Sequence, residues 1–240
     1  MILLIQVAIT TLGISLVAGT CVHCLSTFIE RQYFSRNCES QLNSELDSIA
    51  NDHCENWKSI NLTISLKFLY LSVTFVSALA YITAMDVVEF WEYCLLGWIL
   101  ILLSIIDIRI MIIPSSICII LFLFGIFTAY YIDNNISASL IGSFVGFAIL
   151  RLFIMLYERI RGTPGMGLGD ANLLGAGGAW VGWSEIPDVI LIASISGVAF
   201  FILMTKVLKL LPVGAAIPFG PMLALGIWIV RLIHRLPAAI

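Results

Sequence analysis

Apolar segments of roughly 20 residues recur along the whole chain, and they restrict the fold more than any other feature of the sequence. An α-helix rises about 1.5 Å per residue, so a helix needs a segment of this length to cross the hydrocarbon core of a membrane. Hydrophobic residues make up 60% of the 240 residues and charged residues only 11%, with a net charge of −3. We therefore predict an all-α polytopic protein of the lipid bilayer, and we expect no nucleic-acid binding.

The apolar segments predict about eight transmembrane helices, at 3–28, 62–84, 88–106, 114–132, 136–158, 171–182, 186–208 and 216–233. The sixth segment is too short to cross the membrane alone, so we expect it to pack inside the protein or to continue through the preceding glycine-rich turn. The predicted helices form two parts. Residues 1–84 hold the first two helices with a polar cytoplasmic loop at 29–61, and residues 85–240 hold a six-helix core.

Lys and Arg in the predicted loops lie almost entirely on one side of the membrane. By the positive-inside rule this side is cytoplasmic, and both termini are then expected outside. Arg231 and Arg235, near the C-terminus, depart from the rule. The residues that follow it are Arg31, Arg36, Lys58, Arg109, Arg159, Arg161, Lys206 and Lys209.

Two aspartates remain unexplained at the cytoplasmic ends of the predicted helices. Asp107 ends the third helix, two residues before Arg109, and Asp170 follows the glycine-rich turn from Gly165 to Gly169. A carboxylate at membrane depth is costly and indicates a functional site, although a helix-end ion pair with Arg109 explains Asp107 alone equally well. Two carboxyl groups that share one proton provide an acid and a base, and such a pair can activate water against a peptide bond without a metal. We therefore predict that Asp107 and Asp170 are catalytic.

The glycines of the turn before the second aspartate are Gly165, Gly167 and Gly169. Because they have no side chains, an extended peptide backbone can approach the carboxylate there. We predict that these glycines bind the substrate. In the alternative, they only let helices pack closely, as we expect for Gly142 and Gly146 in the fifth helix.

Further motifs accompany the two aspartates. Gly167 to Asp170 forms a Gly-x-Gly-Asp motif, Asp107 is followed by Pro114, and Ile217 to Pro221 contains Pro-Phe-Gly-Pro. With these motifs, residues 85–235 resemble the type IV prepilin peptidases, which are membrane aspartyl proteases. The resemblance implies an aspartic endopeptidase of the bacterial inner membrane, with Asp107 and Asp170 as its catalytic residues. It would remove the basic leader from type IV prepilins or pseudopilins at the cytoplasmic face.

Many members of this family also methylate the new N-terminus with S-adenosylmethionine. This chain has Asn172 where members often carry Lys, and Pro164 where many have Glu. These departures concern methylation more than proteolysis, because both aspartates are kept. The resemblance therefore leaves methyltransferase activity open, with S-adenosylmethionine as its cofactor, while proteolysis needs no cofactor.

Many family members also have two Cys-x-x-Cys pairs in the first cytoplasmic loop, which resemble a zinc site. This chain has one such pair, Cys21 and Cys24, followed by the single residues Cys38 and Cys54. These four cysteines are weak candidates for metal ligands, because their spacing is not a known zinc pattern. We therefore expect no metal site.

A proton- or cation-coupled transporter is the alternative function, because transporters also use carboxylates inside the membrane. A transport path needs such groups near the middle of the membrane, whereas Asp107 and Asp170 are predicted at its cytoplasmic side. Their position and the motif set favour the peptidase.

Overall fold

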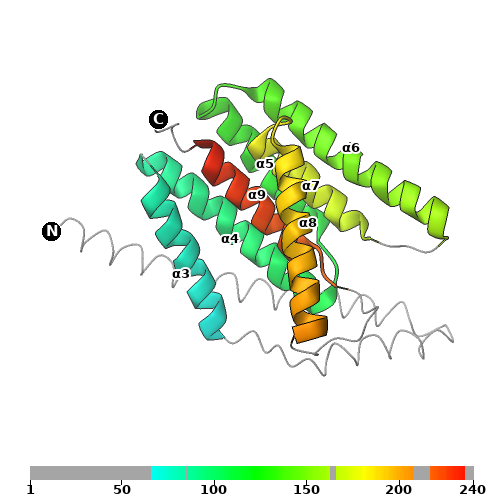
Figure 1. Ribbon diagram of the computed structural model, residues 1–240. Helices are drawn as coiled ribbons and strands as arrows, with labels where there is room; N and C mark the ends of the chain where they lie inside the picture. The colour runs from blue at the N-terminus through cyan, green and yellow to red at the C-terminus, as the bar shows by residue number, and fades with distance from the viewer. Residues whose placement is uncertain (1–65, 85, 163–165, 208–216, 236–240) are drawn as a thin grey trace, which may run out of the picture.

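The computed structural model describes residues 66–84, 86–162, 166–207 and 217–235, and this part of the chain is entirely helical, without strands (Figure 1). The all-α fold is therefore confirmed. The predicted first helix at 3–28 and the loop at 29–61 lie outside the described residues, so the number of eight helices and the division at residue 84 stay predictions. The helices are α3 (Leu66–Thr83), α4 (Val87–Ile110), α5 (Ser115–Tyr131), α6 (Ile136–Arg161), α7 (Leu168–Val181), α8 (Ile186–Ile202), the π-helix η1 (Leu203–Val207) and α9 (Gly220–Arg235).

Within the described ranges, three helical segments are long and apolar enough to cross a membrane: Val87–Ile110, Ile136–Arg161 and Ile186–Thr205. Shorter apolar helices lie at Leu71–Tyr81, Ser115–Tyr131 and Gly220–His234. Large apolar side chains cover the outside of the bundle, as expected where a surface faces lipid and not water. On α6, for example, Phe144 is 73% exposed and Leu152 is 67% exposed.

The short helix α7 lies inside the bundle and packs against α5, α6 and α9 (Figure 1). Almost every side chain from Asp170 to Trp180 is buried, and the run of glycine and alanine at 175–179 lets neighbouring helices approach closely. A Cβ atom on Gly146 of α6, for example, would lie 2.7 Å from the carbonyl oxygen of Leu174. The prediction that the sixth segment packs inside the protein is confirmed, and so is the packing function of the glycine pair in α6.

The connection between α4 and α5 is short. Met111 ends α4 in the left-handed conformation, with φ 52°, and Pro114 is the N-cap residue of α5. The fourth segment therefore begins at the predicted proline. This connection brings the end of α4 and its aspartate next to the beginnings of α7 and α9.

Candidate active site

Asp107 and Asp170 come together at one end of the bundle. Asp107 lies in the last turn of α4 and is 5% exposed, whereas Asp170 lies in the first turn of α7 and is 7% exposed. The two carboxyl groups are close enough to interact electrostatically. The structure therefore brings together two acidic side chains that lie far apart in the sequence.

Asp107 has a backbone partner that sequence reasoning did not foresee. The N–H of Gly220, the first residue of α9, donates to Oδ2 of Asp107 at 2.9 Å. The first N–H groups of an α-helix have no partner within the helix, and together they carry a partial positive charge. Asp107 therefore caps α9 across a separation of 113 residues.

Asp170 lies near the N-terminus of its own helix. It is the third residue of α7, which has Gly167 as its N-cap, and its own backbone N–H donates to the carbonyl of Gly167 at 3.2 Å. An acidic side chain in the first turn interacts favourably with the helix dipole. Each aspartate therefore lies at a helix N-terminus, one at α7 and one at α9. These two helix ends reduce the cost of placing two carboxyl groups in an apolar surrounding.

Ile113, in the connection between α4 and α5, fills the space between these two helix ends. A Cβ atom on Gly169 would lie 2.8 Å from the Cβ of Ile113, and a Cβ atom on Gly220 would lie 3.0 Å from its Cδ1. Gly169, the second residue of α7, and Gly220, the first residue of α9, must therefore be small for both helices to reach the site. Sequence reasoning missed Ile113, because an apolar residue in an apolar segment carries no distinct signal.

The three glycines predicted to bind substrate differ in their surroundings. Gly169 is in close contact with Ile113, which supports a packing function. Gly167 is exposed, and a Cβ atom there would be 3.7 Å from Oδ2 of Asp170, an ordinary contact distance. Gly165 lies outside the described residues. Gly167 is thus the described glycine that leaves room beside the carboxyl group.

Asn172, which takes the place of a lysine frequent in the family, connects two helices at this end of the bundle. Its Nδ2 donates to Oγ of Ser115, the first residue of α5, at 3.1 Å. The side chain therefore has a structural partner in this chain.

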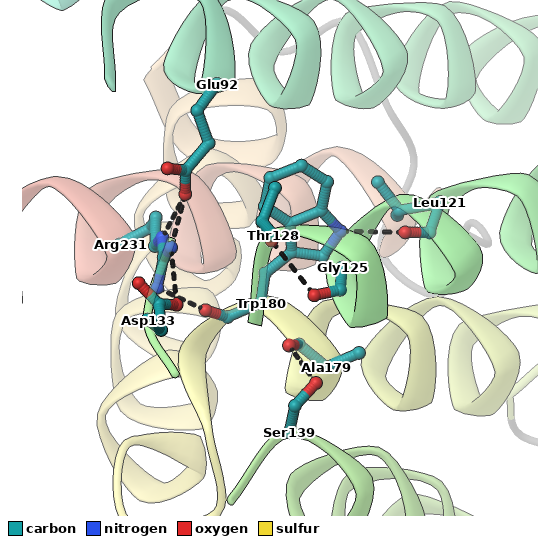
Figure 2. A network of polar contacts seen from close by, with 9 residues as sticks. All are labelled: Glu92, Leu121, Gly125, Thr128, Asp133, Ser139, Ala179, Trp180 and Arg231. Carbon is teal, nitrogen blue, oxygen red and sulfur yellow. Dashed lines mark hydrogen bonds and ion pairs between the residues drawn. The ribbon is translucent and has the colours of Figure 1, made fainter. Parts of the chain in front are cut away.

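A buried arginine lies at the opposite end of α9 (Figure 2). Arg231 donates from Nε to Oε1 of Glu92 at 2.9 Å, and its Nη2 also pairs with Glu92 and with Oδ2 of Asp133. Sequence reasoning treated Arg231 only as an exception to the charge rule. The structure shows that two carboxylates neutralise its charge, and the acidic residues Glu92 and Asp133 at the ends of predicted apolar segments were the signal that could have found it.

The same arginine completes the C-terminal end of α7. The last carbonyl groups of a helix have no partner within the helix. Here Nη1 of Arg231 donates to the carbonyl of Trp180 at 2.7 Å, and Oγ of Ser139 donates to the carbonyl of Ala179 at 2.5 Å (Figure 2). The buried helix α7 thus has an acid at its N-terminus and a base at its C-terminus, as its dipole favours.

The cysteines near the predicted core are packing residues. Cys94 and Cys118 are buried free thiols, whereas Cys21, Cys24, Cys38 and Cys54 lie outside the described residues. Among the described residues, one group has the composition of a metal site: Glu185, Asp188 and His234. In this group, Nε2 of His234 lies 2.5 Å from Oε2 of Glu185. A hydrogen bond between the two side chains explains the contact.

Comparison with known proteins gives the same assignment as the motifs. Residues 94–202 match the type IV leader peptidase family. The prepilin leader peptidase/N-methyltransferase of Stutzerimonas stutzeri is 34% identical over 139 residues, which are 58% of this chain and 48% of the relative. The protein of the same name from Aeromonas salmonicida is 28% identical over 211 residues, 82% of this chain and 71% of the relative.

The protein of that name from Pseudomonas aeruginosa is 33% identical over 139 residues, 58% of this chain and 48% of the relative. The match thus spans about half the length of the Stutzerimonas and Pseudomonas relatives. No solved structure shows a significant match. The resemblance found in the motifs is confirmed, and the segment with both aspartates, residues 94–202, matches the type IV leader peptidase family.

Proposed function

We propose that this chain is a membrane aspartic endopeptidase that removes the leader from type IV prepilins or pseudopilins at the cytoplasmic face of the bacterial inner membrane. The observation that carries the proposal is the position of Asp107 and Asp170, two buried acids on different helices at the point where Gly169 and Gly220 both lie against Ile113. Both lie in the segment that matches the type IV leader peptidase family. The relatives are named prepilin leader peptidases.

In the proposed reaction, one carboxylate takes a proton from a water molecule while the other, protonated, donates a hydrogen bond to the carbonyl oxygen of the scissile peptide bond. The water oxygen adds to the carbonyl carbon. The C–N bond then breaks, and the leaving amine takes a proton from the acid. Coupling between the two groups favours the state with one shared proton, in which an acid and a base are present together.

The charges at the two ends of the bundle support the proposed orientation. Arg109 lies in the last turn of α4, the same turn as Asp107, and Arg159 and Arg161 lie in the last turn of α6, shortly before α7 begins. Basic residues at membrane ends favour the cytoplasmic side. The exception, Arg231, lies at the other end of α9 and is neutralised by Glu92 and Asp133, so it weighs little against this orientation.

The same geometry favours a peptidase over a transporter. Asp107 is three residues from the end of α4, and Asp170 is the third residue of α7. Both acids therefore lie at helix ends, not midway along a crossing helix, where a transport site is expected. A peptide bond at the junction of a basic leader and an apolar helix would reach this position from the cytoplasm.

Methylation of the new N-terminus, with S-adenosylmethionine as methyl donor, is a second activity that the name of the relatives suggests. We keep it in the proposal as a separate step. An assay with a labelled methyl donor, run on the cleaved product, separates it from proteolysis.

The proposed function is tested with the detergent-solubilised chain and a synthetic prepilin that carries a basic leader and an apolar helix. Mass spectrometry of the products is expected to show one cut at the junction. Asp107→Asn and Asp170→Asn should each reduce leader removal to background, because a shared-proton pair fails when either acid is lost. Both variants should remain folded and still show a thermal unfolding transition.

Asp188→Asn is the matched control, since Asp188 is an exposed acid at the opposite end of the bundle. This variant should cleave at the wild-type rate. Near-normal cleavage by either of the two active-site variants would overturn the assignment.

A further inference from the structure

We propose that Gly220 is a positioning residue: its backbone N–H and its missing side chain hold the Asp107 carboxyl group where it can act together with Asp170. The inference rests on the proposed peptidase function. In this inference the first residue of α9 does not only begin the helix but also holds a catalytic carboxyl group in place.

The first argument is the hydrogen bond. The terminal torsion of an aspartate side chain is broad, so packing around the chain alone does not fix the direction of the carboxyl group. In this site, the Gly220 N–H donates to Oδ2 of Asp107 at 2.9 Å, and both groups are buried. A hydrogen bond to a carboxylate is stronger than one between neutral groups. It holds Oδ2 and leaves Oδ1 for exchange of a proton with water or substrate.

The second argument is that α9 has one donor left for this purpose in its first turn. Pro221 has no N–H, and the N–H groups of Met222 and Leu223 both donate to the carbonyl of Phe219. The partial positive charge at the N-terminus of α9 therefore interacts with the Asp107 carboxyl group through the N–H of Gly220.

The third argument is space. A Cβ atom on Gly220 would lie 2.6 Å from Oδ2 and 3.0 Å from Cγ of Asp107, and real Cβ atoms essentially never come closer than 3.0 Å. The backbone of Gly220 is not in the left-handed region, so alanine can adopt it without strain. What alanine would meet is chiefly the movable end of the Asp107 side chain. We therefore expect Gly220→Ala to displace the carboxyl group while the helix stays in place.

The test compares Gly220→Ala with Gly226→Ala on the same helix. A Cβ atom on Gly226 would lie 2.7 Å from the carbonyl oxygen of Val189, a backbone atom of α8 that cannot turn away. Gly226→Ala should lower the melting temperature more than Gly220→Ala but leave kcat per folded molecule unchanged. Gly220→Ala should lower kcat on the order of 10²-fold, because a displacement of about 1 Å costs that much, and should leave KM almost unchanged. Equal kcat values for Gly220→Ala and the wild type would overturn the proposal.

A stability measurement tests the same contact when the variant folds poorly or the chain cleaves nothing. In an Asp107→Ala background the main obstacle to a larger residue at position 220 is gone, so Gly220→Ala should cost less stability there than in the wild type. Gly226→Ala should cost the same in both backgrounds. If Gly220→Ala is equally damaging with and without the Asp107 side chain, the glycine is needed for another reason and the inference fails. If the wild type cleaves prepilin and Gly220→Ala has the same kcat, the inference about Gly220 is refuted but the proposed function stands. If the wild type does not cleave prepilin, the proposed function is refuted.

Discussion

Replacing Arg231 with methionine should destabilise the protein strongly without changing the chemistry of the aspartates. The side chains of Arg231 and Glu92 are 8% and 1% exposed, and that of Asp133 is 25% exposed. Removing one member of a buried ion pair costs about 3–5 kcal/mol, because the other charge remains buried. The hydrogen bond to the Trp180 carbonyl adds about 0.5–1.5 kcal/mol, and the contribution of Asp133 is smaller because water screens it.

The expected loss is therefore about 3.5–6.5 kcal/mol, which corresponds to a fall in melting temperature of roughly 7–26 °C for a chain of this size. Thermal unfolding in one detergent, followed by intrinsic fluorescence or circular dichroism, measures it. Glu92→Gln should cost much less, since a neutral amide still accepts from the guanidinium and Asp133 still balances its charge. Arg161→Met is the control, because Arg161 is exposed and such surface changes stay within about 0.5 kcal/mol.

The refuting result is a melting temperature for Arg231→Met equal to that of Arg161→Met, which would show that the buried network contributes nothing to stability. A second contradiction would come from Glu92→Gln if it were as damaging as Arg231→Met, because the cost would then not come from an uncompensated charge. Material of Arg231→Met that remains folded at low temperature should cleave prepilin normally, since the arginine lies at the end of α9 opposite to Gly220.

Three further predictions concern the site and the packing of α7. Treatment with a chelator should leave the rate of leader removal unchanged, because a pair of carboxyl groups needs no metal; loss of cleavage without unfolding would require a metal-dependent step. Gly167→Ala should reduce kcat/KM with little change in melting temperature, whereas Gly169→Ala should reduce both kcat/KM and melting temperature through its contact with Ile113. Identical behaviour of the two variants in cleavage and melting assays would contradict this difference. Gly146→Ala should lower stability by about 1–3 kcal/mol through overpacking against α7, and an unchanged melting temperature would contradict the close approach.

Much of the helical framework could be predicted from the sequence, because it depends on local patterns. An apolar segment long enough to cross the membrane predicts a helix, because the backbone polar groups must bond within the segment there. The one segment that was too short had to pack inside the protein against other helices. The two aspartates were also found locally, since a carboxylate in an apolar segment is unusual. The glycine pair of α6 carried its packing signal in its spacing.

The contacts that define the site were not predictable in this way. The bond from Gly220 to Asp107 joins residues 113 positions apart, and that from Arg231 to Glu92 joins residues 139 positions apart. Such contacts depend on how helices cross and on the depth at which each one begins, and no local pattern encodes these quantities. Arg231, Glu92 and Asp133 were visible in the sequence, but the contacts between them were not.

The length of α7 has a consequence for where a substrate would be cut. Its 14 residues extend over about 21 Å, whereas the hydrocarbon core of a membrane is about 30 Å thick. If its C-terminus lies at the outer interface, its N-terminus stops about 9 Å below the cytoplasmic one. Asp170 would then meet a substrate at a fixed depth, measured from the point where the apolar helix of that substrate enters the membrane. Shifting the start of that helix by a few residues, with the leader unchanged, should move the cut by the same number of residues.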